Sequence, residues 1–160
     1  DADKRRAFTR AARDENVKLE FGSRVVDEII RRTREDNIDK NGRGFRKYSK
    51  AYVKSTDFKI AGKDKDKVDL TLSGDMLGTM QVIDISGPSV TIGWNIDVED
   101  EKAGFHVKGT PKMPRRDFLG LPKGEQYTIL KSVLRDVPTD TIPVDEIRSA
   151  VDDAIIIEEP

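Results

Sequence analysis

The chain has 160 residues with 29 basic and 30 acidic side chains, and its formal net charge of −1 argues against a globally basic nucleic-acid binder. Charged residues make up 37% of the sequence and hydrophobic residues 36%, which is more charge than the roughly 25% of a typical domain. Cysteine is absent, which excludes disulfides and thiolate metal sites, and no stretch approaches the roughly 20 apolar residues that span a bilayer.

The N-terminal part of the chain is predicted to be helical. Residues 1–21 read as a basic arm or an exposed helix, because their apolar face is thin. From residue 22 onward, apolar residues recur at helical spacing: Val25, Val26, Ile29 and Ile30. Arginines follow in the last turn, where they complement the helix dipole. We therefore expect a firm helix over 22–35, which opens a single domain over 22–160.

A basic and aromatic segment follows a glycine-rich turn. If residues 43–54 form a helix, its aromatic side chains share one face and three of its lysines share another. The basic side chains that could neutralise DNA phosphates are Arg43, Arg46, Lys47, Lys50 and Lys54. We interpret the aromatic stripe as core rather than as a base-stacking platform. The basic face is either a phosphate-contacting surface or ordinary solvated charge.

From residue 57 the hydrophobic period changes to two, which indicates β-strands. Short strands are expected at 57–60, at 68–72 and around Phe105 and Val107, with a short helical turn after Ser73. The clearest alternation covers 89–98, and together with 81–86 it predicts an antiparallel hairpin across a glycine–proline turn. These segments add up to an antiparallel sheet of about four strands.

The C-terminal part is predicted to return to helix. A helix is expected over 123–135, ended by Pro138, and a further helix is expected to start at Pro143. The tail 154–160 is apolar and then acidic, and it predicts either a strand added to a neighbour's sheet or a packed terminus. The predicted class is α+β, with N-terminal helices, an antiparallel sheet and C-terminal helices covering it.

The charges are distributed unevenly along the chain. Residues 31–67 hold 13 basic and 6 acidic side chains, a balance of +7, whereas the acidic tail at 136–160 holds 8 acidic and 1 basic side chain, a balance of −7. Such an asymmetry suits contacts between neighbouring subunits, or a basic face that meets a polyanion. The alternative is two ordinary solvated surfaces.

Sequence signals for catalysis are scarce. No motif for nucleophilic hydrolysis, phosphate cradling or zinc proteolysis is present. His106 is the only histidine, and it follows an acidic run made of Asp97, Glu99, Asp100 and Glu101. We interpret these residues as solvated charge rather than as a metal site or a carboxylate–histidine pair. We expect no catalytic site, no metal and no cofactor; a small hydrolase using His106 is the competing hypothesis.

The stretch MPRRDFLGLP at 113–122 places two arginines beside apolar side chains. Pro114 favours an extended entry, and Phe118, Leu119 and Leu121 form a plug between sheet and helices. Both arginines are expected to project at the rim of this plug with Asp117 as a partner, as suits a subunit interface, where arginine is enriched. The predicted docking loop comprises Met113, Pro114, Arg115, Arg116, Phe118, Leu119 and Gly120.

Three segments have the order and spacing of motifs found together in a known family. KMPRRDFLGLP resembles the signature mPaRpFLGls, EKAGFHVKGT at 101–110 resembles YA.iHqfG, and LTLSGDMLGTMQV at 70–82 resembles L..tG.L..Si.v. GFRKYSKAYVKS at 44–55 is similar to the segment that precedes the sheet in that family. The family is the phage virion morphogenesis family, the Mu-type G protein group. Two pairs depart from its pattern, Ala103-Gly104 and Arg116-Asp117.

The resemblance implies a non-enzymatic structural protein of a tailed-phage virion, assembled in the host cytoplasm. It implies a neck or tail-completion subunit that forms a homo-oligomeric ring at the head–tail junction. The implied partners are other copies of the chain, the head connector and the tail terminator or tube proteins, with passing DNA contacted through its phosphates and no membrane. The alternative that the residues leave open is a small nucleic-acid-binding module using the basic helix 43–54.

Overall fold

The computed structural model describes residues 2–71, 73–135, 143, 145–146 and 148–149, together with the backbone of Ile155–Ile157. Its contacts divide the chain into two compact units, whereas the sequence predicted one domain over 22–160. The first unit is built from Asp1–Asp27, Gln81–Gly93 and Leu121–Glu158, and the second mainly from Glu28–Met80 and Trp94–Gly120. None of the helices in these described parts has the length and apolar character that a membrane span requires.

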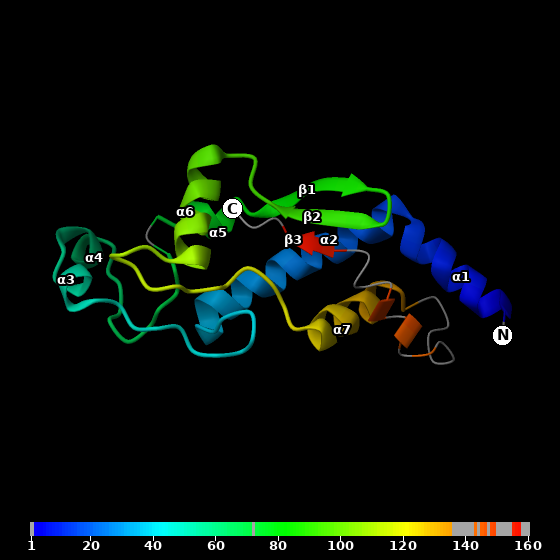
Figure 1. The fold of residues 1–160 in the computed structure, drawn as a ribbon, viewed down its shortest axis with the longest axis horizontal. Coiled ribbons are helices and arrows are strands. Elements are labelled where there is room, and N and C mark those ends of the chain that lie inside the picture. The colour runs from blue at the N-terminus through cyan, green and yellow to red at the C-terminus, as the bar shows by residue number, and fades with distance from the viewer. Residues whose placement is uncertain are drawn as a thin grey trace. The chain divides into compact units, whose positions relative to one another are not determined.

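The first unit contains a small sheet (Figure 1). Strands β1 (Gln81–Ser86) and β2 (Ser89–Gly93) pair as an antiparallel hairpin, with a register shift between Val82 and Asp84. This confirms the predicted hairpin as far as Gly93. Strand β3 (Ile155–Ile157) lies parallel to β2, so these tail residues add to the chain's own sheet. The remaining tail residues lie outside the described part of the chain.

Helix α2 (Glu15–Arg31) packs closely on the hairpin at Gly22. A Cβ atom at this position would lie 2.6 Å from Cγ2 of Val82 and 2.7 Å from Cγ1 of Val90, which is too close for any side chain. The apolar core of this unit contains Phe8, Phe21, Val25, Val26, Val90, Ile92, Leu121, Leu130 and Leu134. The glycine therefore allows the helix backbone to approach the sheet.

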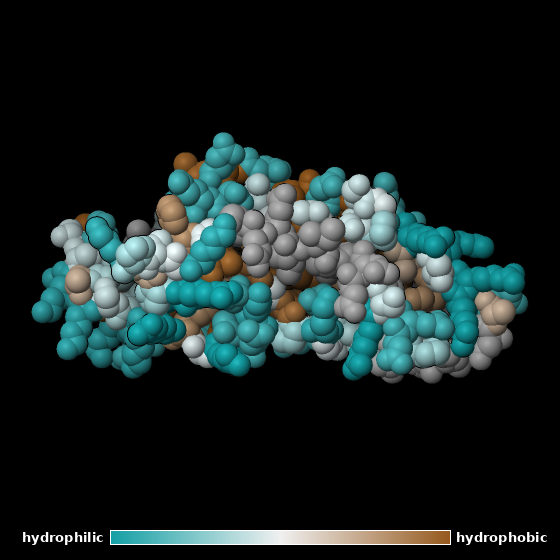
Figure 2. Space-filling view, in the orientation of Figure 1, coloured by the Kyte–Doolittle hydropathy of each residue, from teal (hydrophilic) through white to brown (hydrophobic). Residues whose placement is uncertain are grey.

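The first unit contains further helices. The predicted arm at 1–21 is helix α1 (Ala2–Arg13) followed by the start of α2; α1 buries Phe8, and Figure 2 shows mostly hydrophilic side chains over it. Helix α7 (Lys123–Val133) confirms the predicted helix over 123–135. Helix is also present at Asp145, Glu146, Arg148 and Ser149. The other residues of the helix predicted to start at Pro143 lie outside the described residues.

In the second unit, serine caps produce two short helices where other structures were expected. The Oγ of Ser49 accepts a hydrogen bond from the Tyr52 amide and starts α3 (Lys50–Val53), so the predicted helix over 43–54 is helical only at its end. The Oγ of Ser55 accepts from the Phe58 amide and starts α4 (Thr56–Ile60). The predicted strand at 57–60 is therefore wrong, because N-capping stabilises a helical turn here.

Helix α6 (Asp97–Lys108) replaces both the end of the predicted strand 89–98 and the predicted strand around Phe105. Acidic residues occupy its first turn, where they interact favourably with the helix dipole. Glu99, Ala103 and Val107 repeat every four residues and form its buried face. The strand predicted at 68–72 is wrong as well, because residues 68–71 form neither strand nor helix. Without strands at 57–60, 68–71 and 94–108, the predicted antiparallel sheet of about four strands reduces to the hairpin plus β3, although the chain remains a mixture of helix and strand.

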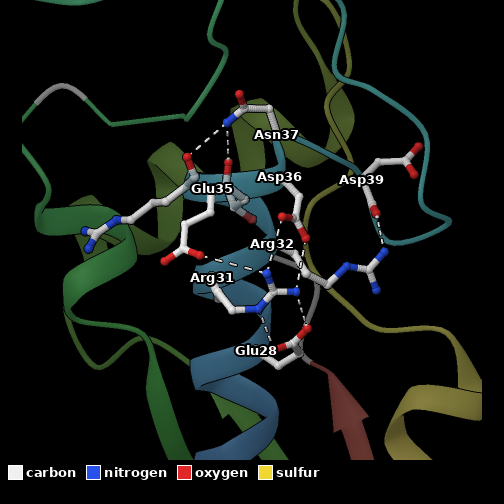
Figure 3. Close-up of polar contacts among 9 residues, drawn as sticks. Glu28, Arg31, Arg32, Glu35, Asp36, Asn37 and Asp39 are labelled. Carbon is white, nitrogen blue, oxygen red and sulfur yellow. Dashed lines mark hydrogen bonds and ion pairs between the residues drawn. The ribbon is translucent and has the colours of Figure 1, made fainter.

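The end of α2 is organised by polar contacts (Figure 3). A π-helical turn, η1 (Arg32–Asp36), extends the helix, and Asn37 closes it in the left-handed conformation with φ of 55°. The Arg31 guanidinium contacts Glu28 at 2.7 Å and Asp36 at 3.0 Å. The hydrogen bond from Arg31 lowers the pKa of Glu28. The helix over 22–35 is thus confirmed, and it starts earlier than predicted.

The short helical turn expected after Ser73 is also present, as helix α5 (Asp75–Gly78).

Candidate functional site

The segment 113–121 begins at a tight turn that follows α6. Gly109 ends the helix with φ of 76°, and a Cβ there would lie 2.9 Å from the Arg115 backbone nitrogen. The Thr110 amide donates to the Met113 carbonyl at 2.8 Å, and the Met113 amide donates back at 3.1 Å. This turn directs Pro114 and the two arginines back along α6, where the Arg116 amide donates to the His106 carbonyl at 2.7 Å.

The apolar plug predicted for this segment is present in the second unit. Phe118 is 2% exposed, and Leu119, the next residue in the sequence, is also buried. The Phe118 ring meets Trp94 edge-to-face with a centroid separation of 6.3 Å. Trp94 is fixed in turn, because its Nε1 donates to the Met76 carbonyl at 2.6 Å. Gly120 has φ of 142°, which favours glycine over other residues.

The two arginines of the segment take different environments. Arg115 is exposed and donates to Oδ2 of Asp117 at 2.7 Å, as predicted. Arg116 is only 4% exposed, so the prediction that it projects at the rim is wrong. Its Nε donates to the Arg46 carbonyl at 2.9 Å and its Nη2 to the Lys47 carbonyl at 3.2 Å. These backbone carbonyls draw the guanidinium inward.

The buried Arg116 guanidinium also lies against an aromatic ring, 5.2 Å from the centroid of Tyr48. Among the described residues no carboxylate forms an ion pair with it. Burial lowers the pKa of Arg116, although an arginine remains protonated in proteins. The site therefore contains a buried positive charge that only carbonyl dipoles and a ring face compensate.

Arg116 lies in the wall of a cavity of about 360 Å³ within the second unit. The walls are partly aromatic and apolar, and four of the remaining lining side chains are cationic. The lining residues are Tyr48, Ser49, Tyr52, Lys63, Leu70, Thr71, Ser73, Gly74, Met76, Lys102, His106, Lys112, Met113, Pro114 and Arg116. No aspartate or glutamate occurs among these described lining residues.

Two of the four cations are neutralised by carboxylates outside the lining. Lys63 donates to Oδ1 of Asp69 at 2.7 Å and to the Thr71 carbonyl. Burial acts to raise the pKa of Asp69, but hydrogen bonds led by that from Lys63 outweigh it and lower the pKa. Lys102 contacts Glu99 at 2.8 Å. Lys112 and Arg116 have no carboxylate partner among the described residues, so the lining carries a net positive charge.

His106 is half-buried in the same wall, and the structure does not place it on a solvated polar face as predicted. Its Nδ1 is buried without a hydrogen-bond partner in the described part of the chain. Burial, followed by the charges of Arg116 and Lys63, lowers the pKa of His106 to about 4. The imidazole is therefore neutral near pH 7. No group of three metal-ligating side chains occurs among the described residues.

The basic residues predicted on a helix at 43–54 do not share one helical face. Lys47 lies before α3 and contacts Asp66 at 3.5 Å, with both side chains largely exposed. Lys50 begins α3, and Lys54 caps its end. Arg43, Arg46, Lys50 and Lys54 are all exposed. The aromatic side chains pack against one another instead, since the Tyr48, Tyr52 and Phe58 rings meet edge-to-face at 5.2–5.6 Å.

The sequence-based prediction missed Lys63, Lys102, Lys112 and His106 as members of one site. These residues come from a loop, from α6 and from the turn after it, and no short motif joins them. The spacing of Lys102 and His106 is one usable signal, because residues four apart lie on one face of a helix. The prediction of strands in this region concealed that signal.

The arrangement suits the binding of a ligand. It combines a neutral histidine, two cations without carboxylate partners and an apolar wall in one cavity. Comparisons of the chain with protein-family models, with curated proteins and with solved structures found no match.

Proposed function

We propose that the chain is a structural subunit of a tailed-phage virion, a neck or tail-completion protein that assembles as a ring at the head–tail junction. The proposal starts from the three motif segments that resemble the phage virion morphogenesis family. Its partners would be other copies of the chain, the head connector and the tail terminator or tube proteins.

One observation carries this proposal: two other segments that bear the resemblance, 101–110 and 44–55, meet at Arg116 within the second unit. The backbone of Arg116 binds the 101–110 segment through the His106 carbonyl at 2.7 Å. Its side chain binds the 44–55 segment through the Arg46 and Lys47 carbonyls. Residues that belong to separate sequence motifs therefore build one interior. That is the behaviour expected of motifs that maintain a subunit's shape.

The segment itself supports a structural role. Phe118 and Leu119 fill the core, while Arg115 remains at the surface, 64% exposed in its side chain. An exposed arginine next to a rigid plug is a common feature of protein interfaces. The proposed interface residue is therefore Arg115, whereas Arg116 serves the interior.

The test is the composition of the virion. The chain should be detected by mass spectrometry in purified phage particles, and particles from a phage lacking its gene should have heads and tails that fail to join. The variant Arg115→Ala should fold normally and reduce the yield of joined particles, whereas Lys108→Ala, an exposed change elsewhere in the same unit, should not. Absence of the chain from purified, infectious particles would end the proposal.

DNA contact is the second candidate function, and exposed basic residues favour it. Arg43, Arg46, Lys50 and Lys54 are exposed in the second unit, and α1 carries five basic residues. Without a helix over 43–54, such contact would use phosphates rather than bases. Binding of a short DNA duplex that weakens steeply with salt would support it. Equal binding by a chain with Lys50 and Lys54 changed to Glu would exclude this surface.

A further inference from the structure

We propose that the cavity of the second unit binds a carboxylate carried on an apolar body, either a free organic acid or the acidic side chain of another polypeptide. The proposal does not depend on a role in the virion, because it rests only on the lining of the cavity. The two proposals can fail separately. If the chain is present in virions but does not bind a carboxylate, only the cavity proposal fails; if it binds a carboxylate but is absent from virions, only the virion proposal fails.

The first argument is the charge of Arg116. A buried cation is costly unless a counter-charge accompanies it, and Arg116 is buried without a carboxylate partner among the described residues. Its hydrogen bonds to the described residues use Nε once and Nη2 once. An arginine has five N–H donors, so the guanidinium retains donors for an anion. A carboxylate matches the planar geometry of these donors.

The second argument is that other groups on the wall favour the same charge. Lys112 is exposed at the cavity without an ion pair among the described residues. The buried Nδ1 of His106 has no partner there either, and as a neutral imidazole it can donate or accept a hydrogen bond. No described carboxylate lines the cavity to repel an anion. A carboxylate supplies the counter-charge that the two cations lack among the described residues, together with hydrogen-bond acceptors.

The third argument is the apolar part of the wall. Tyr48, Tyr52, Leu70, Met76, Met113 and Pro114 line the cavity. A bare inorganic anion would leave these side chains against water, whereas an organic acid would cover them. The cavity of about 360 Å³ lies at the lower end of the roughly 300–1,000 Å³ typical of small-molecule sites. It fits a ligand of about the size of an aromatic acid or one acidic side chain with its neighbours.

Benzoate is a suitable probe, and benzamide is its uncharged control. The only histidine of the chain lies in the cavity wall, so its ring signals in an NMR spectrum report on the site without an assignment problem. Benzoate should shift these signals in a saturable manner at concentrations below about 10 mM, a weak but specific affinity. Benzamide should not. No saturable shift with benzoate, or equal shifts with both probes, would overturn the proposal.

Two charge reversals provide a matched pair of variants. Lys112 lines the cavity. Lys108 lies just before it in the sequence and is also exposed, but it does not line the cavity. Lys112→Glu should weaken benzoate binding by about tenfold or more, because a like charge at a binding site is strongly unfavourable, and Lys108→Glu should leave it within about twofold. Equal effects of the two reversals would contradict the assignment. Arg116→Gln should abolish binding if its spectrum shows a folded chain.

Short peptides test whether the bound carboxylate belongs to a free organic acid or to the acidic side chain of another polypeptide. A capped tripeptide with glutamate between two leucines represents an acidic side chain, and the same peptide with glutamine is its control. Tighter binding of the glutamate peptide than of benzoate would assign a polypeptide ligand, and the reverse would assign a free acid. Inorganic phosphate binding more tightly than both would overturn the requirement for an apolar body.

Discussion

Each of the two units is stabilised internally by a different kind of interaction. In the first unit, α2 meets the hairpin at Gly22 through apolar contacts with Val82 and Val90. In the second, buried Arg116 is compensated by two backbone carbonyls and a ring face, and Lys63 is compensated by Asp69. Apolar packing is indifferent to pH, whereas buried charges are not. The second unit should therefore respond to acid and to ligands as well as to changes in volume, whereas the contacts at Gly22 in the first unit should respond to changes in volume alone.

The largest expected effect is in the plug of the second unit. Phe118→Ala should reduce the free energy of unfolding by about 3–5 kcal/mol, because it removes a fully buried ring. Phe105→Ala is the matched control, since Phe105 lies in the same unit and is 46% exposed. Urea denaturation of both variants checks the prediction. Equal, small losses for the two variants would show that the plug does not carry the stability of its unit.

Acidification should destabilise the second unit through His106. The pKa of His106 is about 4 in the folded chain, and an unfolded histidine titrates near 6.5. As the pH falls below 6.5 the unfolded state binds a proton first, so stability falls, by about 2 kcal/mol at pH 5. Urea denaturation at pH 7 and at pH 5 checks this prediction. The free energy of unfolding of the wild-type chain should fall by this amount between the two pH values, and that of His106→Gln should not.

The carboxylates should act at lower pH, which separates them from His106. The pKa values of Glu28 and Asp69 are lowered, the former by the hydrogen bond from Arg31 and the latter by Lys63 against the effect of burial. Their stabilisation is present above the unfolded pKa and is lost as the pH falls through the folded one. It should therefore disappear only below about pH 4. A histidine resonance that titrates near pH 6.5 in the folded chain would contradict the assignment of the loss between pH 7 and pH 5 to His106.

In the first unit the contrasting change is one of volume. Gly22→Ala should destabilise by about 1–3 kcal/mol, because the added methyl group overlaps Val82 and Val90. Gly124 also lies in a helix, but nothing lies within 4 Å of its Cβ position. Gly124→Ala should therefore stabilise by up to about 1 kcal/mol, since alanine is the better helix former. Thermal melts of the pair test this, and effects of the same sign would refute the close approach.

The smallest expected effect on folding comes from exposed lysines of the second unit. Changing Lys47, Lys50 and Lys54 together to Glu should cost less than about 1 kcal/mol per residue, because exposed charges contribute little. If these residues contact DNA or a neighbouring copy, the same variant should fail to complement a phage that lacks the gene. Normal complementation would show that the charges are only solvated surface.

The sequence predicted some elements correctly from their hydrophobic periodicity. The hairpin at 81–93 and the helix α7 are examples. It failed at 56–60 and at 97–108, where a capping serine and an acidic first turn start helices within an alternating pattern. These local signals outweigh the alternation of Phe58 with Ile60, and of Trp94 with Ile96 and Val98, which on its own favours a strand.

The site was less predictable than the fold, for a physical reason. Burial of Phe118 follows from its chemistry, and its prediction is confirmed. Burial of Arg116 depends on the carbonyls of Arg46 and Lys47, about seventy residues away in sequence. Backbone carbonyls are the same in every residue, so a pattern of side chains contains no record of them. The cavity therefore becomes visible only when the chain is folded.

Trp94 gives the second unit an optical signal of its own. It is the only tryptophan of the chain, it is 6% exposed, and it contacts Phe118. Its indole emission should lie at short wavelength in the folded state and shift to the red when water reaches the ring. Because the first unit has no tryptophan, fluorescence follows the second unit alone, while far-ultraviolet circular dichroism follows the whole chain. Unfolding curves that coincide in the two signals would mean that the two units unfold as one cooperative structure.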